Sequence, residues 1–207
     1  MAVGEFQATG DAQGLAALIS RANAEAGATN RALPPVDRWN PPDCGDIDME
    51  IRADGTWFYM GTPIGRAPLV RLFSTVLRKD EDGKTYLVTP VEKVGIRVVD
   101  APFVAVEMTA TGKGDQQRLT FRTNVGDVVE AGGEHALRFV CEGEHSELKP
   151  YLHVRGRLEA LVSRAVMYDL VERGETVDVD GVAMFAVRSG GVVFPVMPAA
   201  ELEALAR

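Results

Sequence analysis

The chain has 207 residues, of which 46% are hydrophobic and 25% charged, a composition typical of a globular protein with one large domain or two small ones. Its formal net charge of -8 repels nucleic acid and anionic membranes, so neither is an expected partner. A small anion is compatible with this charge only if local donors capture it.

The N-terminal segment has no basic stretch ahead of its short apolar run LAALI, so no secretory signal is predicted. No stretch reaches the roughly 18 apolar residues that span a bilayer. Cys44 and Cys141 lie far apart and suggest no disulfide framework. We therefore expect a cytoplasmic protein.

The first predicted element is a helix. Leu15 and Ile19 recur at helical spacing after Asp11, a candidate N-cap, and Gly27 offers a stop. The prolines of LPPVDRWNPPDCG then remove backbone donors and predict an extended connector.

A hairpin and a second helix follow the connector. Apolar and polar residues alternate in DIDMEIRADGTWFYM, which predicts two strands that turn at Asp54-Gly55. RAPLVRLFSTVLR has one apolar face and places Pro68 in its first turn, a pattern that predicts a helix. TYLVTP and VGIRVVD are typical of strands.

Beyond residue 101, strands dominate. Short runs rich in Val, Phe and Thr between residues 102 and 141 predict an antiparallel meander. The spacing of apolar residues predicts the longest helix over residues 155–173. Three more strands follow, with turns at Asp-Gly and Gly-Gly, and PAAELEALAR predicts a short closing helix.

These elements predict an α+β fold made of two small mixed domains of antiparallel strands, each with an amphipathic helix and with a cleft between them. Residues 1–44 form a helical arm and connector, 45–100 a first domain and 101–207 a second. Both halves follow the order extended segment, Gly-Arg, helix, Asp-Gly turn and strands. Gly65-Arg66 and Gly156-Arg157 are the matching pairs, but identity is too low to establish a structural repeat.

Several segments are specific enough to compare with a known family. PPVDRWNPPDCGDIDMEI, DGTWFYMGTPI, YLVTPVEKV, DAPFVAVE, LTFRTNVGD and PYLHVRGRLEALVSRAV resemble the uncharacterised bacterial family called domain of unknown function twelve-eighty-five. The resemblance spans about residues 34–195. It implies two small α+β domains with related motifs, a cleft between them and a role in signalling through a nucleotide-like ligand. It supplies no catalytic residues.

Cationic side chains gather where the predicted long helix begins. Arg155 and Arg157 there could clamp a phosphate or carboxylate beside the helix N-terminus. The alternative is structural pairing with Glu147 or Glu159. Arg164, seven residues after Arg157, projects from nearly the same stripe of that helix.

Aromatic residues accompany these cations. Trp57 and Tyr59 point to one face of their strand, where they either stack on a ligand or are buried. Arg66 is the counterpart of Arg157 in the first half and inherits the same two interpretations. The candidate ligand-binding residues are Trp57, Tyr59, Arg66, Asn124, Tyr151, Arg155, Arg157 and Arg164.

Motifs for catalysis or metal binding are weak. Cys141 and His145 lack the paired spacing of a zinc site, and no phosphate-binding loop, nucleophile elbow or dinucleotide fingerprint occurs. Glu92 could act as a base if buried, but no second catalytic group accompanies it. We therefore expect no catalytic residue, metal or cofactor, and binding is favoured over catalysis.

The leading hypothesis is a non-enzymatic cytoplasmic protein that binds a small anionic, nucleotide-like ligand in the interdomain cleft and signals to a protein partner. The alternative is a protein interaction or scaffold module with no small-molecule ligand.

Overall fold

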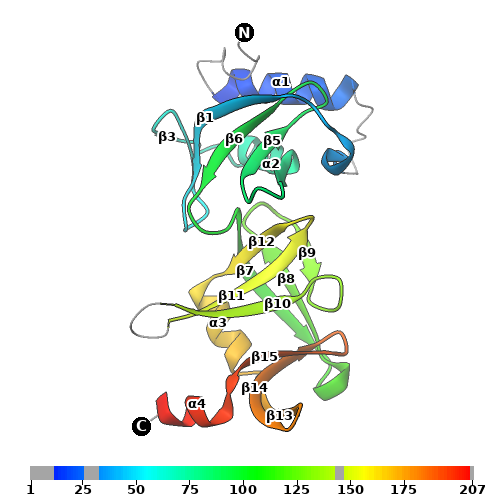
Figure 1. Cartoon of the computed structure of the whole chain (residues 1–207), viewed down its shortest axis with the longest axis vertical. Coiled ribbons are helices and arrows are strands. Elements are labelled where there is room, and N and C mark those ends of the chain that lie inside the picture. The colour runs from blue at the N-terminus through cyan, green and yellow to red at the C-terminus, as the bar shows by residue number, and fades with distance from the viewer. Residues whose placement is uncertain (1–11, 26–32, 143–146, 206–207) are drawn as a thin grey trace. The chain divides into compact units, whose positions relative to one another are not determined.

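The computed structural model describes residues 12–25, 33–142 and 147–205, and the chain divides into two compact units. The first unit comprises Met1–Pro102 and Gly156–Leu158, and the second comprises Phe103–Arg155 and Glu159–Arg207. Both combine sheets with a few helices, which confirms the predicted α+β class (Figure 1). Within the described residues, no helix is long and apolar enough to cross a membrane.

The first unit is built on a mixed sheet with the strand order β3-β2-β1-β6-β5-β4. Its strands are β1 (Asp43–Ile51), β2 (Trp57–Tyr59), β3 (Thr62–Pro63), β4 (Leu77–Lys79), β5 (Thr85–Val88) and β6 (Lys93–Val98). Neighbours are antiparallel except β1 and β6, which are parallel. β1 and β2 form the predicted hairpin, in which Ile51 pairs with Trp57, although its loop covers residues 52–56 instead of two residues.

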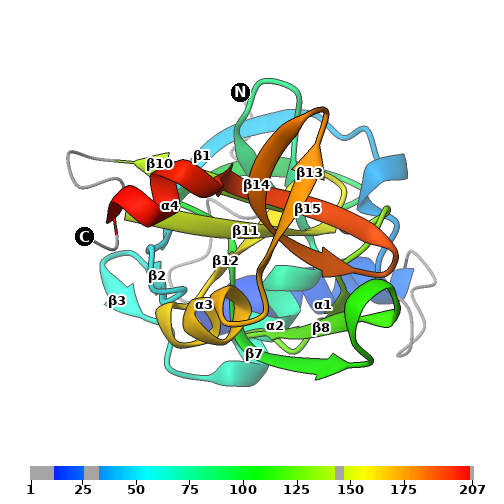
Figure 2. The same cartoon turned by 90° about the horizontal axis from the view of Figure 1, so that it is seen from below.

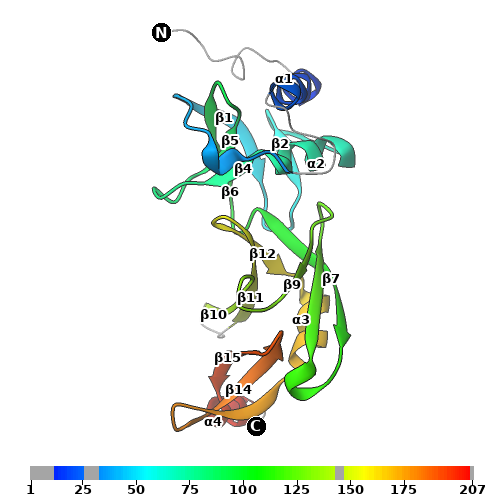
Figure 3. The same ribbon diagram turned by 90° about the vertical axis from the view of Figure 1, so that its right-hand side faces the viewer.

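Helices supply apolar side chains to the core of this unit. They are α1 (Ala12–Glu25), a 3-10 helix (Val36–Arg38) and α2 (Ala67–Thr75). Pro68 lies in the first turn of α2, where no helical amide bond is lost, and Phe73 is fully buried. α1 packs beside α2 (Figure 3) and buries Leu15 and Ile19 completely. The predicted N-cap Asp11 lies outside the described residues.

Arg78 on β4 joins the Pro-rich connector to the sheet. Its Nη1 donates to the carbonyl oxygens of Val36 and Trp39 at 2.8 and 2.7 Å. Its Nε and Nη2 donate to the two carboxylate oxygens of Asp80 at 2.6 and 3.1 Å, and Lys93 Nζ adds a bond at 2.9 Å. Burial disfavours the charged form of Asp80, but these bonds and charges outweigh it and hold the pKa of Asp80 below its ordinary value.

The second unit contains a mixed sheet with the order β10-β11-β12-β7-β8-β9. Its strands are β7 (Phe103–Thr111), β8 (Arg118–Thr123), β9 (Val128–Glu130), β10 (Leu137–Glu142), β11 (Glu147–Arg155) and β12 (Leu158–Val162). β7, β8 and β9 form the predicted meander. β10 leaves the meander and pairs with β11, while β12 pairs in parallel with β7.

A smaller sheet, β13-β14-β15, completes the second unit. Its strands are β13 (Glu175–Val179), β14 (Val182–Ser189) and β15 (Val192–Pro198), with α4 (Ala199–Leu205) after them; a 3-10 helix (Gly114–Gln116) precedes β8. α4 contacts β14 and β15 (Figure 2). Ser189 links the sheets, because its buried Oγ accepts from Leu119 N at 2.8 Å and donates to Ala131 O at 2.7 Å.

The predicted helix over residues 155–173 is wrong in its first half, which forms strands. β11 and β12 are joined by a tight turn in which Gly156 has a φ of 53°. β12 buries Leu158, Ala160 and Val162, the alternation of a strand. Leu158 and Val162 are four residues apart, so their spacing fits both helical and strand periods, and tertiary pairing with β7 decides between them.

The helix of this region starts later and is shorter than predicted. α3 (Arg164–Val171) begins after Ser163, whose Oγ accepts from Val166 N at 3.5 Å. Arg155 ends β11 and Arg157 follows in the turn. Neither of these two arginines therefore lies at a helix N-terminus.

The order of elements recurs in the two halves. Apart from the two-residue β3, which lies between β2 and α2, a hairpin, a helix and three strands come in the order β1, β2, α2, β4, β5 and β6, and again in the order β11, β12, α3, β13, β14 and β15. Gly83 and Gly181, with φ of 81° and 83°, turn equivalent strand pairs. The predicted match of Arg66 with Arg157 is wrong, however, because Arg66 precedes a helix and Arg157 lies in a hairpin turn.

Candidate functional site

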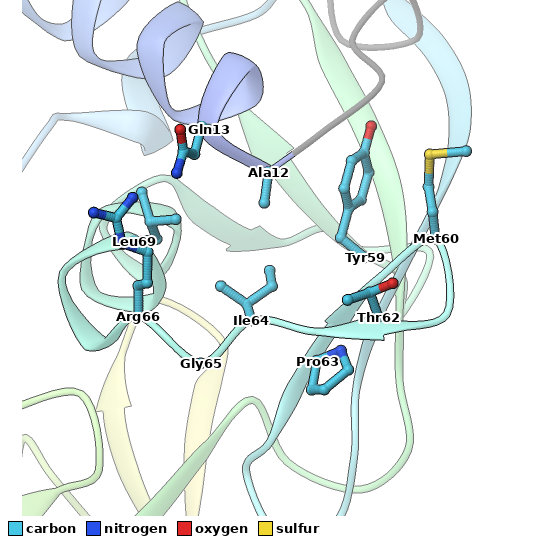
Figure 4. Close-up of a pocket in the computed structure, with 10 residues that line it drawn as sticks. All are labelled: Ala12, Gln13, Tyr59, Met60, Thr62, Pro63, Ile64, Gly65, Arg66 and Leu69. Carbon is cyan, nitrogen blue, oxygen red and sulfur yellow. The ribbon is translucent and has the colours of Figure 1, made fainter.

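A pocket of about 480 Å³ opens in the first unit between the start of α1, the β2–β3 hairpin and the start of α2 (Figure 4). Its lining residues are Ala12, Gln13, Tyr59, Met60, Thr62, Pro63, Ile64, Gly65, Arg66 and Leu69. In the view of Figure 4, Gln13 and Arg66 lie at one end and Tyr59, Met60 and Thr62 at the other. The pocket brings together two of the predicted ligand-binding residues, Tyr59 and Arg66.

Local backbone geometry shapes the far end of the pocket. Tyr59 pairs with Thr62, so the hairpin turns through Met60 and Gly61, whose φ angles are 48° and 71°. Gly61 adopts this left-handed conformation without steric cost, but Met60 does not. Met60 is 58% exposed, so the turn holds a large apolar side chain at the pocket mouth.

Arg66 is the cation among the pocket residues that the structure describes. It occupies the N-cap position of α2 with extended backbone (φ -94°, ψ 102°) and an exposed side chain. Within residues 12–25, 33–142 and 147–205, no carboxylate forms an ion pair with it, and no acidic residue lines the pocket. The positive end of α2 adds to its charge. An anion in the pocket would therefore meet a guanidinium that no described carboxylate neutralises.

Trp57 does not line the pocket. It is 1% exposed and stacks on Phe73 with ring centroids 6.1 Å apart, so it is part of the core. Its Nε1 is a buried donor without a hydrogen-bond partner in the described part of the chain. Phe58, on the other strand face, lies under the guanidinium of Arg52 at 3.6 Å.

Two further candidates, Arg155 and Asn124, lie in the second unit and take part in its internal bonding. Arg155 Nη1 donates to Asp127 Oδ2 at 2.7 Å, and its guanidinium lies 4.8 Å from the ring centre of Phe103. Asn124 Oδ1 accepts from Val104 N at 3.0 Å. Arg155 therefore has a carboxylate partner, but it is neither Glu147 nor Glu159, the residues expected from the sequence.

Tyr151 belongs to the same unit and is buried. Arg138 stacks on its ring at 4.4 Å and binds Glu159 through Nε and Nη2 at 3.1 and 2.8 Å. Glu159, one of the expected partners of Arg155 and Arg157, therefore binds a different arginine, Arg138. Tyr151 and Arg138 form a structural stack on neighbouring strands.

The remaining candidates are exposed. Arg157, which clusters with the first unit, donates to Glu81 Oε1 at 2.8 Å, and Arg164 Nε donates to the hydroxyl of Tyr168 at 3.2 Å. Arg157 borders a wider hollow of about 580 Å³ that is also lined by Arg38, Arg78 and the carboxylates of Asp37 and Asp80, and Arg78 is held by the bonds described above. Neither Arg157 nor Arg164 lines the pocket at Arg66.

Glu92, the candidate base, is buried in the turn between β5 and β6. It lies near Cys44, and burial, followed by the charge of Glu92 and a hydrogen bond with it, raises the pKa of the Cys44 thiol. A raised pKa keeps this thiol protonated and poorly nucleophilic at neutral pH. Within the described residues, no three His, Cys, Asp or Glu side chains gather to hold a metal ion.

Sequence reasoning missed Gln13, Met60, Thr62 and Leu69 as pocket residues. Met-Gly directly after an aromatic strand is a turn signal that could have indicated the exposed Met60. Gln13 carries no such signal, because its position depends on how α1 packs beside α2.

The fold and this pocket define the class of protein: an α+β chain of two units, the first of which carries a pocket with a mixed apolar and polar lining and a guanidinium at its edge. Family sequence models described as the N-terminal domain of DUF1285, a domain of unknown function, and the C-terminal domain of DUF1285, a protein of unknown function, match residues 34–101 and 102–196. The chain therefore belongs to the DUF1285 family, as its sequence segments predicted.

Solved structures of the same family resemble this chain. A DUF1285 family protein from Silicibacter pomeroyi DSS-3 is 50% identical, with a TM-score of 0.79 over 88% of this chain and 97% of that one. Another, from Shewanella baltica OS155, is 28% identical, with a TM-score of 0.47 over 60% of this chain and 90% of that one. No curated protein matches the chain.

Proposed function

We propose that this protein binds a small organic anion in the pocket beside Arg66 and acts as a non-enzymatic binding protein. The observation that carries the proposal is an exposed guanidinium without a described carboxylate partner, at the edge of a pocket that no acidic residue lines within the described part of the chain. The sequence placed the ligand in an interdomain cleft, whereas this pocket is formed by residues of the first unit alone.

Electrostatics supports an anion at this point. A guanidinium at the positive end of a helix dipole is mildly unfavourable by itself, and an anion shared by both removes the conflict. A charge-assisted hydrogen bond from arginine contributes about 1.5–3 kcal/mol. Because the whole chain carries a net charge of -8, such local contacts must capture the anion without long-range steering.

The proposal includes a role in signal transduction, in which binding of the anion is signalled to a protein partner. The ligand could be nucleotide-like, as the family resemblance implies. We place this activity in the cytoplasm, a setting that suits two cysteines that form no disulfide.

A protein interaction module is the second candidate. Met60 is 58% exposed, and β3 is the terminal strand of the described sheet, so an extended segment of a partner could pair with it and cover this methionine. In that case Arg66 would contribute to an interface and not to a small-molecule site.

A thermal-shift screen separates these candidates. Both tryptophans, Trp39 and Trp57, lie in the first unit, so intrinsic fluorescence reports the melting of the unit that holds the pocket. Carboxylates, inorganic phosphate and nucleotides should be tested on wild type, Arg66→Gln and Arg71→Gln. Arg71 is a matched control, because it is exposed on the same helix and does not line the pocket.

A stabilising anion whose effect is lost in Arg66→Gln and kept in Arg71→Gln supports the binding function. If no anion in the screen stabilises the wild type, or if both variants respond as the wild type does, the anion-binding proposal is wrong.

A further inference from the structure

We infer that the anion bound at Arg66 is a monocarboxylate with an apolar body. This inference rests on the proposed binding function and concerns the chemistry of the same pocket. The charge and the lining of the pocket favour such a monocarboxylate over a nucleotide-like ligand.

The charge of the pocket matches a single negative charge. Arg66 is the cation among the described lining residues, and the other polar side chains of the lining are Gln13 at the same end and Tyr59 and Thr62 at the far end. A carboxylate carries one charge and is planar, so it can accept both parallel N–H groups of a guanidinium. A phosphate monoester carries about -1.5 to -2 at pH 7 and would stay partly uncompensated here.

The walls of the pocket suit hydrocarbon. Ala12, Met60, Pro63, Ile64 and Leu69 contribute apolar side chains around the space next to Arg66. The ribose hydroxyls and base edges of a nucleotide would lose water against these apolar residues, and the other described polar side chains of the lining are few, namely Gln13, Tyr59 and Thr62. An alkyl or aryl body gains free energy from the same burial.

Met60 gives the apolar wall a specific role. It is held at the pocket mouth in a left-handed conformation (φ 48°) that favours glycine, so a side chain is kept there against a backbone cost. Methionine is flexible and fits apolar partners of variable shape. It would cover the distal part of the carboxylate's hydrocarbon body.

Isothermal titration calorimetry with matched probes tests the inference. Octanoate, 1-octanol, inorganic phosphate and AMP should be titrated into the full chain and into Arg66→Gln, Arg71→Gln and Met60→Gly. Octanoate should bind best, and Arg66→Gln should weaken it about ten- to a hundredfold, the size of a lost charge-assisted bond. Arg71→Gln should leave its affinity unchanged, and 1-octanol should bind at least about tenfold more weakly than octanoate to wild type.

Met60→Gly separates binding from folding. The variant should melt no lower than wild type, because glycine relieves the left-handed strain, yet it should bind octanoate about three- to tenfold more weakly through lost apolar contact. Unchanged octanoate affinity in Met60→Gly would show that Met60 does not contact the hydrocarbon body and would overturn the inferred apolar ligand.

The titrations test the monocarboxylate inference separately from the proposed anion-binding function. If AMP or phosphate binds in an Arg66-dependent way and octanoate does not, the monocarboxylate inference is overturned while anion binding stands. If none of the probes binds, or Arg66→Gln binds octanoate as wild type does, both are overturned.

Discussion

The variant Arg78→Met should unfold at a lower urea concentration than the wild type and than variants that lose an exposed charged side chain. The substitution keeps an apolar stem and removes the guanidinium from a side chain that is only 14% exposed. It leaves the carbonyl oxygens of Val36 and Trp39 without this donor and takes two hydrogen bonds from Asp80. The connector before β1 then loses its attachment to β4.

The cost follows from these contacts. Breaking one side of a fully buried ion pair costs about 3–5 kcal/mol. The pair of Arg78 and Asp80 and the bonds to the two carbonyl oxygens are only partly buried, so the cost is lower. Asp80 retains Lys93 and is partly exposed, so water recovers some of the loss. We expect a net decrease of about 2–4 kcal/mol in the free energy of unfolding.

Urea unfolding followed by tryptophan fluorescence measures this loss. Arg97→Met is the matched control, because Arg97 lies on a strand of the same sheet and pairs with Glu50 while its side chain is 74% exposed. The control should lose less than about 1 kcal/mol. Equal losses in the two variants, or a loss below about 1 kcal/mol for Arg78→Met, would refute the structural role of this network.

The same network predicts a pH dependence. Hydrogen bonds from Arg78 and Lys93 hold the pKa of Asp80 below its ordinary value despite burial. A group with a lowered pKa stabilises the fold above its unfolded pKa of about 3.9, and the contribution is lost as pH falls through the folded value. The stability gap between wild type and Arg78→Met should therefore shrink below about pH 4. A gap that stays constant from pH 7 to pH 3 would contradict this linkage.

Two further predictions concern the second unit. Ser189→Ala should cost about 2–3 kcal/mol by circular dichroism in urea, since it strands a buried amide and a buried carbonyl; a cost under 0.5 kcal/mol would contradict the link. Gly112→Ala should destabilise clearly more than Gly181→Ala. Both positions have left-handed backbone, but a Cβ at Gly112 would lie 2.1 Å from the carbonyl oxygen of Gln116, whereas nothing lies near Gly181. Equal melting temperatures for these two variants would count against the turn geometry at Gly112.

Elements whose pattern is local could be predicted from the sequence. The hairpin before Trp57, the helix after Arg66 and the strands around Asp180-Gly181 all occur where periodicity and turn residues place them. The prediction of a long helix failed because the spacing of Leu158 and Val162 fits both the helical and the strand period. The segment forms a strand because β12 pairs with β7, which lies more than fifty residues earlier in the sequence.

The candidate site was harder to predict, because ion-pair partners and pocket walls are set by distant contacts. Arg155 pairs with Asp127, which lies 28 residues earlier in the chain, and not with a neighbouring glutamate. Trp57 and Tyr59 share a strand face, as expected, but only Tyr59 lines the pocket. Arg66 could be named from the sequence, whereas its pocket depends on α1 packing beside α2.

The most direct test of the central claim is an NMR titration of the protein labelled at its methionine methyl groups. Met60 lines the pocket at Arg66, while Met184 and Met197 lie in the second unit and serve as internal references. On addition of octanoate, and separately of AMP, we expect at least one probe to shift the Met60 resonance while the references stay still. In Arg66→Gln, the same shift should need at least about ten times more of that probe. A Met60 resonance that neither probe moves, or one that moves equally in Arg66→Gln, would contradict anion binding at this pocket.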